Sequence, residues 1–368
     1  MSNYFNPVKI IYTENWLNKL KISQKNLSIS NPILVTSPGN RKRLKLDSKF
    51  NSDSIFSEIG ENPNFADCGN VINFCNGKSY DGVIAQGGGS VMDLAKVVMA
   101  FLSTGETNIV DLLEHKGKYE RSIPSIFLPT THGTGSEVTK WGTVWDMKEK
   151  KKYSISHIDL YPSIAILDGN LTVSLPIDIS IMTILDALSH SFESIWNKNA
   201  NEKSTEYAIE AITIILSNVE FLKQNPTDLN VRNKLLEAAT KAGLAFSNTK
   251  TAAAHSISYP LTIRFGIPHG VASSLSLIPL LEINGEHIKD PLDNICHKLN
   301  ITFDELIEKI KTIPKCVIPY TLSEWRVAKS DLPQLVDESF TKGRMDNNIV
   351  DLSTDDVLGI LKELLSEQ

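Results

Sequence analysis

Two residues four positions apart have the types and spacing to bind a metal ion. Asp186 and His190 lie in TILDALSHSF (183–192), a run whose other residues predict a buried helix. In a helix, residues i and i+4 project from the same face. A carboxylate and an imidazole on one face are common metal ligands. An aspartate that accepts a hydrogen bond from a core histidine gives the same pattern, so the pair needs partners before it defines a site.

Two further histidines follow in AAAHSISYPLTIRFGIPHG (252–270). His255 and His269, together with Asp186 and His190, make one carboxylate and three imidazoles. This set suits Zn²⁺ or Fe²⁺ with a position left open for a substrate. Each of the two later histidines, taken singly, is equally consistent with a structural role. Only the combination predicts a metal site.

A glycine-rich stretch, AQGGGSVMDLAK (85–96), follows an apolar strand and opens a helix. Glycines let backbone N–H groups approach phosphate oxygens, and a helix N-terminus adds partial positive charge. The alternative is a tight strand-to-helix turn. The stretch is no Walker loop, because Lys96 lies too far along the helix, and no nucleophile elbow, because Met92 stands where glycine is required.

A second loop, PTTHGTGSEVT (129–139), also follows an apolar strand. Its small hydroxyl-bearing residues can hydrogen-bond phosphate, ribose or a carboxamide, although many such loops are only turns. Both loops follow putative parallel strands at their carboxyl ends. We therefore expect them at one edge of a sheet, where open α/β folds bind nucleotides.

The elements that must position these residues change in character along the chain. Short β-branched runs at 33–36, 82–86, 125–128 and 164–167 predict a Rossmann-like parallel sheet covered by helices. After residues 171–176, helical periodicity takes over, as in 206–222 and 232–246. We predict an α/β nucleotide-binding domain (1–173) and an all-α metal-binding domain (174–368), with a boundary near Ser174, where a proline soon opens a helix.

Composition narrows the function classes. The 368 residues suit two domains, and 37 Lys and Arg against 43 Asp and Glu give a net charge of −6 without long single-sign runs. This disfavours nucleic acid or an anionic membrane as partner and favours a small molecule. The four cysteines form no CxxC pair, and neither a signal peptide nor a span of ~20 apolar residues is evident. We expect a cytoplasmic protein.

The motifs together resemble a known family. DALSHSFES, a histidine followed fourteen positions later by that of IPHG, GGGSVMDLAK and PTTHGTGSEVT resemble the iron-containing (group III) alcohol dehydrogenases. The resemblance runs from the first strand to the C-terminal helix. It implies a dehydroquinate synthase-like fold, a divalent metal with Fe²⁺ first and Zn²⁺ second, NADPH or NADH, and a homodimer. The implied reaction is reduction of a small aldehyde, whose carbonyl the metal polarises for hydride transfer.

The resemblance also implies roles for individual positions. Four residues match the metal ligands: Asp186, His190, His255 and His269. Four match the pyrophosphate motif: Gly88, Gly89, Ser90 and Asp93. Five match positions that line the nucleotide cleft: Thr130, Thr131, Thr134, Thr139 and Lys152.

Two departures from the family pattern concern catalysis. Many members carry a second histidine four residues after the third ligand, where this chain has Tyr259. We expect the proton to reach the product through Tyr259, water or the ribose hydroxyl, with packing as the alternative role for the tyrosine. His132 stands where the family usually has a small residue. It either contacts substrate or cofactor, or caps a turn.

A third departure concerns the cofactor. NAD-preferring relatives tend to carry an acidic residue after the first nucleotide-side strand, where this chain has Ser37. Loss of a carboxylate removes its repulsion of a 2′-phosphate, and Arg41, Lys42 and Arg43 follow closely. We therefore predict that NADPH is accepted. A solvated basic turn is the alternative.

The substrate prediction also rests on resemblance. SEVTKWGTVWD, KKYSIS and HSISYPLTIRFGIPHG are most similar to phosphonoacetaldehyde reductases, which form 2-hydroxyethylphosphonate. Such a substrate needs cations besides the metal, for which Arg264 and Lys140, then Arg344, are candidates, unless these are ordinary surface charges. The alternatives are a general short-chain alcohol or butanol dehydrogenase, a glycerol dehydrogenase-like enzyme, and a non-catalytic metal- and nucleotide-binding protein.

Overall fold

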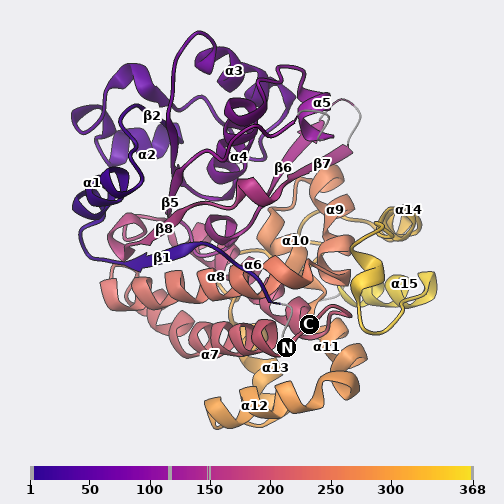
Figure 1. Cartoon of the computed structure of the whole chain (residues 1–368). Coiled ribbons are helices and arrows are strands. Elements are labelled where there is room, and N and C mark those ends of the chain that lie inside the picture. Colours follow the sequence, from indigo (N-terminus) through magenta and orange to yellow (C-terminus); the bar gives the residue numbers. More distant parts are fainter. Residues whose placement is uncertain (1–3, 115–117, 147, 149–150, 366–368) are drawn as a thin grey trace. The chain divides into compact units, whose positions relative to one another are not determined.

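The computed structural model describes residues 4–114, 118–146, 148 and 151–365. Its internal contacts divide the chain into two compact units. Of the described residues, those within Asn6–Thr131 and Ser136–Thr172 form the α/β unit, and those within Met1–Phe5, His132–Gly135 and Val173–Gln368 form the helical unit. In Figure 1 the first is drawn mainly in indigo to magenta and the second mainly in red to yellow.

The α/β unit contains a six-stranded sheet in which all paired strands are parallel. Its order is β1-β8-β5-β4-β2-β3. The strands are β1 (Lys9–Tyr12), β2 (Pro32–Thr36), β3 (Ile55–Phe56), β4 (Gly82–Gly87), β5 (Ser125–Pro129) and β8 (Ile164–Leu167). The four predicted strands are confirmed as β2, β4, β5 and β8. The order reverses between β2 and β4, because β3 continues to one side of β2 whereas β4, β5 and β8 extend to the other.

The strands read as continuous apolar runs because both faces of the sheet are covered. Ile33 and Val83 pack on one face, in the same apolar cluster as residues of α3 (Phe65–Cys75) and α4 (Gly89–Thr104). Leu34 and Ile84 pack on the other, with Leu20 of α1 (Trp16–Asn26). Adjacent residues of a strand therefore pack into different apolar clusters, one on each face of the sheet.

The remaining elements of this unit are short. They are α2 (Pro38–Arg43), α5 (Ile109–Leu113) and an antiparallel hairpin of β6 (Trp141–Asp146) and β7 (Lys151–Ser156). The hairpin comes from SEVTKWGTVWD and KKYSIS, for which we predicted no strands. Gly142 lets β6 lie against α4, since a Cβ there would come 2.9 Å from the carbonyl oxygen of Asp93.

The helical unit is built on α6 (Ile177–Ile195), α7 (Glu202–Gln224) and α8 (Leu229–Thr249), which pack on one another around a large apolar cluster. Figure 1 shows α7 and α8 side by side. The predicted helices 206–222 and 232–246 lie within α7 and α8. The later helices are α9 (Ala253–Phe265), α10 (His269–Leu275), α11 (Leu277–Asn284), α12 (Lys289–Leu299), α13 (Phe303–Thr312), α14 (Leu332–Glu338) and α15 (Thr354–Glu363).

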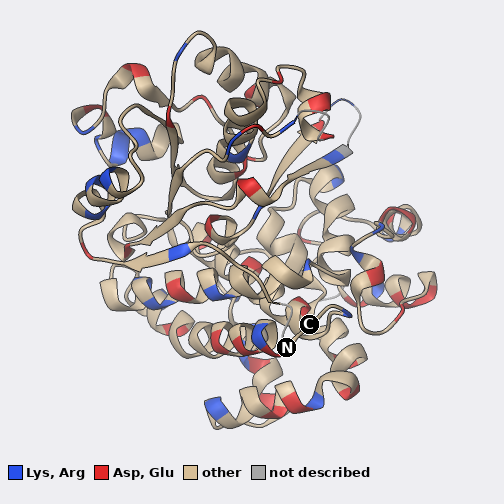
Figure 2. Cartoon of the chain, in the orientation of Figure 1, with Lys and Arg blue, Asp and Glu red and all other residues tan. Residues whose placement is uncertain are grey.

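Local sequence explains where the main helices begin. Pro176 directly precedes α6, and Asn201 caps α7 in a reciprocal capping box with Ser204. The Asp228 side chain caps α8 by accepting from the backbone N–H of Val231. Charges of both signs are interspersed over the helices of this unit (Figure 2). Among the described residues, no helix has the length and apolar character needed to cross a membrane.

Candidate metal centre and nucleotide site

Three helices of the helical unit bring together side chains that can bind a metal. Asp186 lies on α6, His255 on α9 and His269 is the first residue of α10. The Oδ1 atom of Asp186 is 3.5 Å from Nε2 of His255 and 3.8 Å from Nε2 of His269. One ligand atom from each of the three residues lies within 4.8 Å of the others. Side chains far apart in sequence therefore converge on one point.

Gly270 makes this convergence possible. A Cβ at this position would lie 2.0 Å from the carbonyl oxygen of Met182 and 3.1 Å from Cβ of Asp186. Only a residue without a side chain therefore lets α10 approach α6 this closely. The close approach places His269, one residue earlier, beside Asp186.

His190 flanks the three converging residues. Its Nδ1 atom is 4.0 Å from Oδ2 of Asp186, on the same face of α6. Its ring stacks between those of Phe246 and His255, with centroid separations of 4.1 and 4.5 Å. All four predicted ligands thus lie together, with the plane of the His190 ring fixed by its two neighbours.

A second buried carboxylate, which we did not predict, supports His255. Glu193 lies three residues after His190 on α6 and is fully buried. Its Oε2 atom is 2.5 Å from Nδ1 of His255, and its Oε1 accepts from the backbone N–H of His255 at 3.0 Å. A carboxylate on Nδ1 fixes the ring and directs Nε2 toward Asp186. The available sequence signal was an acidic residue within one turn of His190 in an otherwise apolar helix.

The electrostatics of this centre favour a cation. Burial alone would raise the pKa of Asp186, but His190, His255 and His269 together hold it well below its usual range. Burial alone would lower the pKa of His255, but Glu193 and Asp186 raise it to about 10. Positive charge at this point is therefore stabilised. The donor set of one carboxylate and three imidazoles fits a divalent transition metal, and His269, with 28% of its side chain exposed, gives the centre a solvent-facing ligand.

Tyr259 lies one turn beyond His255 on the same face of α9. Its side chain is mostly buried, and its hydroxyl accepts a hydrogen bond from Nε of Arg344 at 3.3 Å. Arg264, nearer the end of α9, instead makes a two-bond ion pair with Glu338 through Nε and Nη2. The predicted substrate role of Arg264 would thus require this pair to break.

Residues predicted to bind the nucleotide gather in the α/β unit at the carboxyl ends of β2, β4 and β5. Ser37 follows β2 and caps α2 by accepting from the backbone N–H of Asn40. Gly88 precedes α4 without a side-chain cap, so the first N–H groups of this helix suit an anion. A Cβ at Gly88 would lie 3.0 Å from the Thr131 methyl group, and Thr130 N donates to Gly87 O. These residues lie where the strand order reverses, the usual nucleotide position in such sheets.

Asp93 and Thr139 belong to a buried network centred on Lys96. The Lys96 ammonium donates to the carbonyl oxygens of Ser136 and Trp141 and to the Thr139 hydroxyl, at 2.7–2.9 Å. Asp93 accepts from the Ser136 hydroxyl at 3.0 Å. Burial lowers the pKa of Lys96 to about 8 against the opposing effect of Asp93 and Glu137. The network fixes the loop between β5 and β6, a role that the sequence did not reveal.

The other predicted positions have separate surroundings. His132 and Thr134 lie in the segment that belongs to the helical unit. His132 is fully buried, and burial followed by the charge of Arg232 lowers its pKa to about 3, so the ring is neutral near pH 7. Lys152 on β7 lies over the ring of Trp145, 5.5 Å from its centroid. Lys140 is half-buried in the α/β unit.

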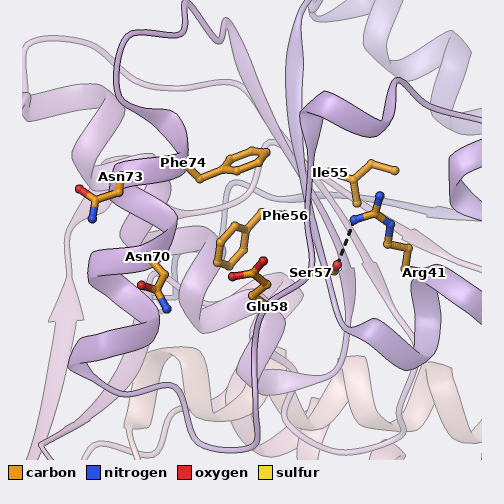
Figure 3. Close-up of a pocket in the computed structure, with 8 residues that line it drawn as sticks. All are labelled: Arg41, Ile55, Phe56, Ser57, Glu58, Asn70, Asn73 and Phe74. Atoms are coloured by element: carbon orange, nitrogen blue, oxygen red, sulfur yellow. Dashed lines mark hydrogen bonds between the residues drawn. The ribbon is translucent and has the colours of Figure 1, made fainter.

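The basic turn after β2 is partly neutralised. Figure 3 shows Arg41 at a pocket that is also lined by Ser57 and Glu58. The Arg41 guanidinium donates to both carboxylate oxygens of Asp47 and to the Ser57 hydroxyl. Arg43 donates to backbone and side-chain oxygens of the same unit. A 2′-phosphate would therefore have to compete with Asp47 for Arg41.

Comparison with known proteins defines the class. Residues 7–169 match the iron-containing alcohol dehydrogenase family model, and residues 180–365 match the C-terminal model of the Fe-containing alcohol dehydrogenase family. The chain belongs to the iron-containing alcohol dehydrogenase family. This family uses iron and NAD(P)H, which the metal centre and the glycine-rich turn described above fit.

Individual relatives differ in their substrates. A probable alcohol dehydrogenase, EutG, from Escherichia coli K12 is 35% identical over 55% of this chain and 51% of its own. A phosphonoacetaldehyde reductase from Streptomyces viridochromogenes is 32% identical over 55% and 53%. The matched region thus spans about half the length of these relatives. The structure of sulfoacetaldehyde reductase from Bifidobacterium kashiwanohense in complex with NAD⁺ superposes with a TM-score of 0.89, covering 100% of both chains at 27% identity.

Proposed function

We propose that this chain is a metal- and NAD(P)H-dependent reductase that converts a short aldehyde with an anionic group into the primary alcohol. Phosphonoacetaldehyde, which would give 2-hydroxyethylphosphonate, is the proposed substrate. The observation that carries the reductase proposal is the convergence of Asp186, His255 and His269 within 4.8 Å, with Glu193 behind His255. In this proposal residues 1–173 bind the nucleotide and residues 174–368 bind the metal.

The proposed roles follow from the contacts. Asp186, His190, His255 and His269 hold the metal, and Glu193 keeps the His255 ring in the orientation that binding requires. When bound, the metal would supply a Lewis acid for the carbonyl oxygen and the nicotinamide would supply the hydride. The chain's own task is to orient both groups and the aldehyde. No covalent nucleophile is needed.

For the nucleotide, we propose that Gly88, Gly89 and Ser90 at the start of α4 bind the pyrophosphate through backbone N–H groups. Ser37 lies beside the ribose in this proposal, and Thr130, Thr131, Thr134 and Lys152 provide further contacts. Asp93 and Thr139 act through the Lys96 network, which fixes the loop, rather than through the cofactor alone.

Cofactor choice depends on the surroundings of Ser37. We propose that NADPH is accepted together with NADH, since no carboxylate occupies position 37. Because Asp47 engages Arg41, Asp47→Ala releases this cation and should raise kcat/KM for NADPH while that for NADH changes little. A strong preference for NADH in both proteins would argue against a 2′-phosphate site.

Tyr259 is the proposed proton source for the product alcohol. It lies one turn from His255 and contacts Arg344 through its hydroxyl. His132 is neutral near pH 7, so we propose a contact with substrate or cofactor rather than a charged acid for this residue. Full turnover of Tyr259→Phe across the pH range would remove the tyrosine from the mechanism.

The anionic substrate class is supported by relatives. The names of two of them specify phosphonoacetaldehyde and sulfoacetaldehyde. Both are two-carbon aldehydes whose second carbon carries a phosphonate or sulfonate group. The probable alcohol dehydrogenase EutG has a higher identity, 35% against 32% for the phosphonoacetaldehyde reductase, and its name specifies no charged substrate. A general alcohol dehydrogenase is therefore the competing function.

The test is oxidation of NADPH and NADH by the metal-loaded protein with phosphonoacetaldehyde, butyraldehyde and glycolaldehyde. We expect phosphonoacetaldehyde to have the highest kcat/KM. Comparable kcat/KM values for all three aldehydes would favour a general alcohol dehydrogenase. Absence of turnover, with metal and nucleotide still bound, would favour a non-catalytic protein. Light scattering on the purified protein would test the homodimer that we also propose.

A further inference from the structure

Arg344 differs from two other arginines of the helical unit, Arg264 and Arg232. It is half-buried, and its guanidinium has no carboxylate partner among the described residues. Arg264 is paired with Glu338. Arg232 is fully buried, with its nitrogens donating to neutral oxygens of Leu175, Ser180 and Pro226. Of these three arginines, Arg344 is the one that is partly accessible and has no carboxylate partner among the described residues.

Two donors of Arg344 are directed by neutral neighbours. Nε donates to the Tyr259 hydroxyl at 3.3 Å, and Nη1 donates to the carbonyl oxygen of Gly343 at 2.8 Å. Nη2 has no acceptor among the described residues. A guanidinium held in this way presents a fork of N–H groups, which matches the oxygens of a carboxylate, phosphonate or sulfonate.

The backbone that carries Arg344 is fixed against α9. Ser256, the residue after His255, donates through its hydroxyl to the carbonyl oxygen of Ser339 and accepts from the backbone N–H of Thr341 at 3.1 Å. The Asn347 side chain donates to the carbonyl oxygen of Thr251 at 2.9 Å. Contacts on both sides of Arg344 thus hold it beside the helix that provides a metal ligand.

Spacing along α9 relates Arg344 to the metal centre. His255 and Tyr259 lie on one face, with a rise of roughly 6 Å between their Cα positions, which is one helical turn. His255 faces Asp186, whereas Tyr259 contacts Arg344. The contact of Arg344 thus lies one helical turn along α9 from the ligand His255, and a substrate of two or three carbons is proposed to extend between them.

We propose that Arg344, oriented by Tyr259, is the specificity-determining residue that binds the anionic group of a short aldehyde substrate. This inference rests on the proposed reductase function and replaces Arg264 as the substrate-binding cation. Phosphonate, sulfonate and carboxylate share the recognised chemistry, which is a compact oxyanion one or two carbons from the carbonyl. Lys140 belongs to the α/β unit, and this inference does not use it.

The test compares Arg344→Gln with Arg264→Gln as the matched control. Removal of the Arg344 charge should lower kcat/KM for phosphonoacetaldehyde and sulfoacetaldehyde by about 100-fold, mainly through KM, because a charge-assisted contact is lost. The value for butyraldehyde, which has no anionic group, should fall far less, and a decrease common to all three aldehydes would measure the contact of Arg344 with Tyr259. Arg344→Lys should restore part of the lost activity, since it retains the charge but not the fork. Arg264→Gln should leave all three values nearly unchanged.

Equilibrium binding separates this inference from the reductase function. Calorimetry with 2-hydroxyethylphosphonate and 2-hydroxyethanesulfonate should show binding to the wild-type protein and to Arg264→Gln, and weaker binding to Arg344→Gln, with Zn²⁺ affinity and thermal midpoint unchanged. The relative affinities identify the preferred oxyanion. Equal binding by Arg344→Gln, or parallel losses for charged and neutral aldehydes, would overturn the assignment. Absence of turnover with every aldehyde would count against the reductase, while the binding data would still decide the role of Arg344.

Discussion

Glu193 determines how His255 faces the metal centre. Glu193→Ala removes the acceptor on Nδ1, so the ring can rotate or change tautomer. We expect Zn²⁺ affinity, measured by calorimetry, to fall by roughly 10- to 100-fold. Glu210→Ala is the control, because Glu210 is a surface residue of α7 that pairs with Lys241. Unchanged affinity in Glu193→Ala would show that packing alone orients His255.

His132 makes stability depend on pH. Its pKa falls to about 3 in the folded protein from an ordinary value near 6.5, so below pH 6.5 the unfolded chain binds a proton that the folded chain does not. Stability from this residue is complete above pH 6.5 and is lost as the pH falls toward 3. The loss between pH 7 and pH 5 is about 2 kcal/mol.

The measurement is urea unfolding of the wild type and of His132→Gln at both pH values. The variant cannot gain this proton, so its free energy of unfolding should fall by less over the same interval. Equal decreases in the two proteins would mean that other groups account for the pH dependence.

Sequence reasoning predicted the four residues that lie together at the candidate metal centre but missed Glu193, which supports His255. Asp186 and His190 are visible from their spacing, and His255 and His269 from their order and the family likeness. Glu193 was missed because a lone glutamate on a helix usually faces solvent. Arg264 ranked above Arg344 as a substrate candidate because it lies in the same motif as His255. Arg344 is 85 residues from Tyr259 in the chain, so the sequence could not show that the two side chains are in contact.

At the scale of elements, the approach of α10 to α6 decides whether the metal ligands meet. Gly270→Ala would place a methyl group 2.0 Å from the Met182 carbonyl oxygen, so the helices must separate. We expect a loss of about 2–4 kcal/mol of unfolding free energy and weaker Zn²⁺ binding, checked by urea unfolding and calorimetry.

The control for this variant is Gly359→Ala. Gly359 lies inside α15, and a Cβ there would meet nothing within 4 Å. Alanine should therefore stabilise the protein by about 0.5–1 kcal/mol through its higher helix propensity. Similar effects of the two substitutions would contradict the role given to the close approach.

Elements with a strong apolar pattern could be predicted from the sequence. Very short strands, and a helix that continues past a proline, could not. The runs at 33–36 and 82–86 become central strands because they are apolar on both faces. β3 has only two residues, and β1 (KIIY) is exposed at both ends, so neither gives the continuous apolar run that marks β8. α9 contains Pro260, which normally ends a helix, yet the helix continues to Phe265, with its residues from Ala253 to Leu261 buried against the rest of the unit.

For the whole molecule, a metal that binds only the folded helical unit must stabilise it. Zn²⁺ at 100 times its dissociation constant should add about 2.7 kcal/mol, and a chelator should remove this gain. Calorimetric scans of the wild type with Zn²⁺ or with chelator test the expectation. Asp186→Asn is the control, since loss of the carboxylate should abolish the dependence on Zn²⁺. A wild-type thermal midpoint that changes neither with Zn²⁺ nor with the chelator would exclude a tight metal site.

The helical unit is assembled from three separate parts of the chain, which limits how this protein can be recombined. Tyr4 donates to the carbonyl oxygen of Leu244, Phe5 exchanges two hydrogen bonds with Asn248, and Gly135 lies against Gly243 so closely that a Cβ would come 2.3 Å from its Cα. A gene fusion that joins residues 174–368 to the first half of a paralogue would thus import a foreign 132–135 segment into contact with α8. Successful chimaeras should be those that transplant this tetrapeptide and the N-terminal arm together with the helices.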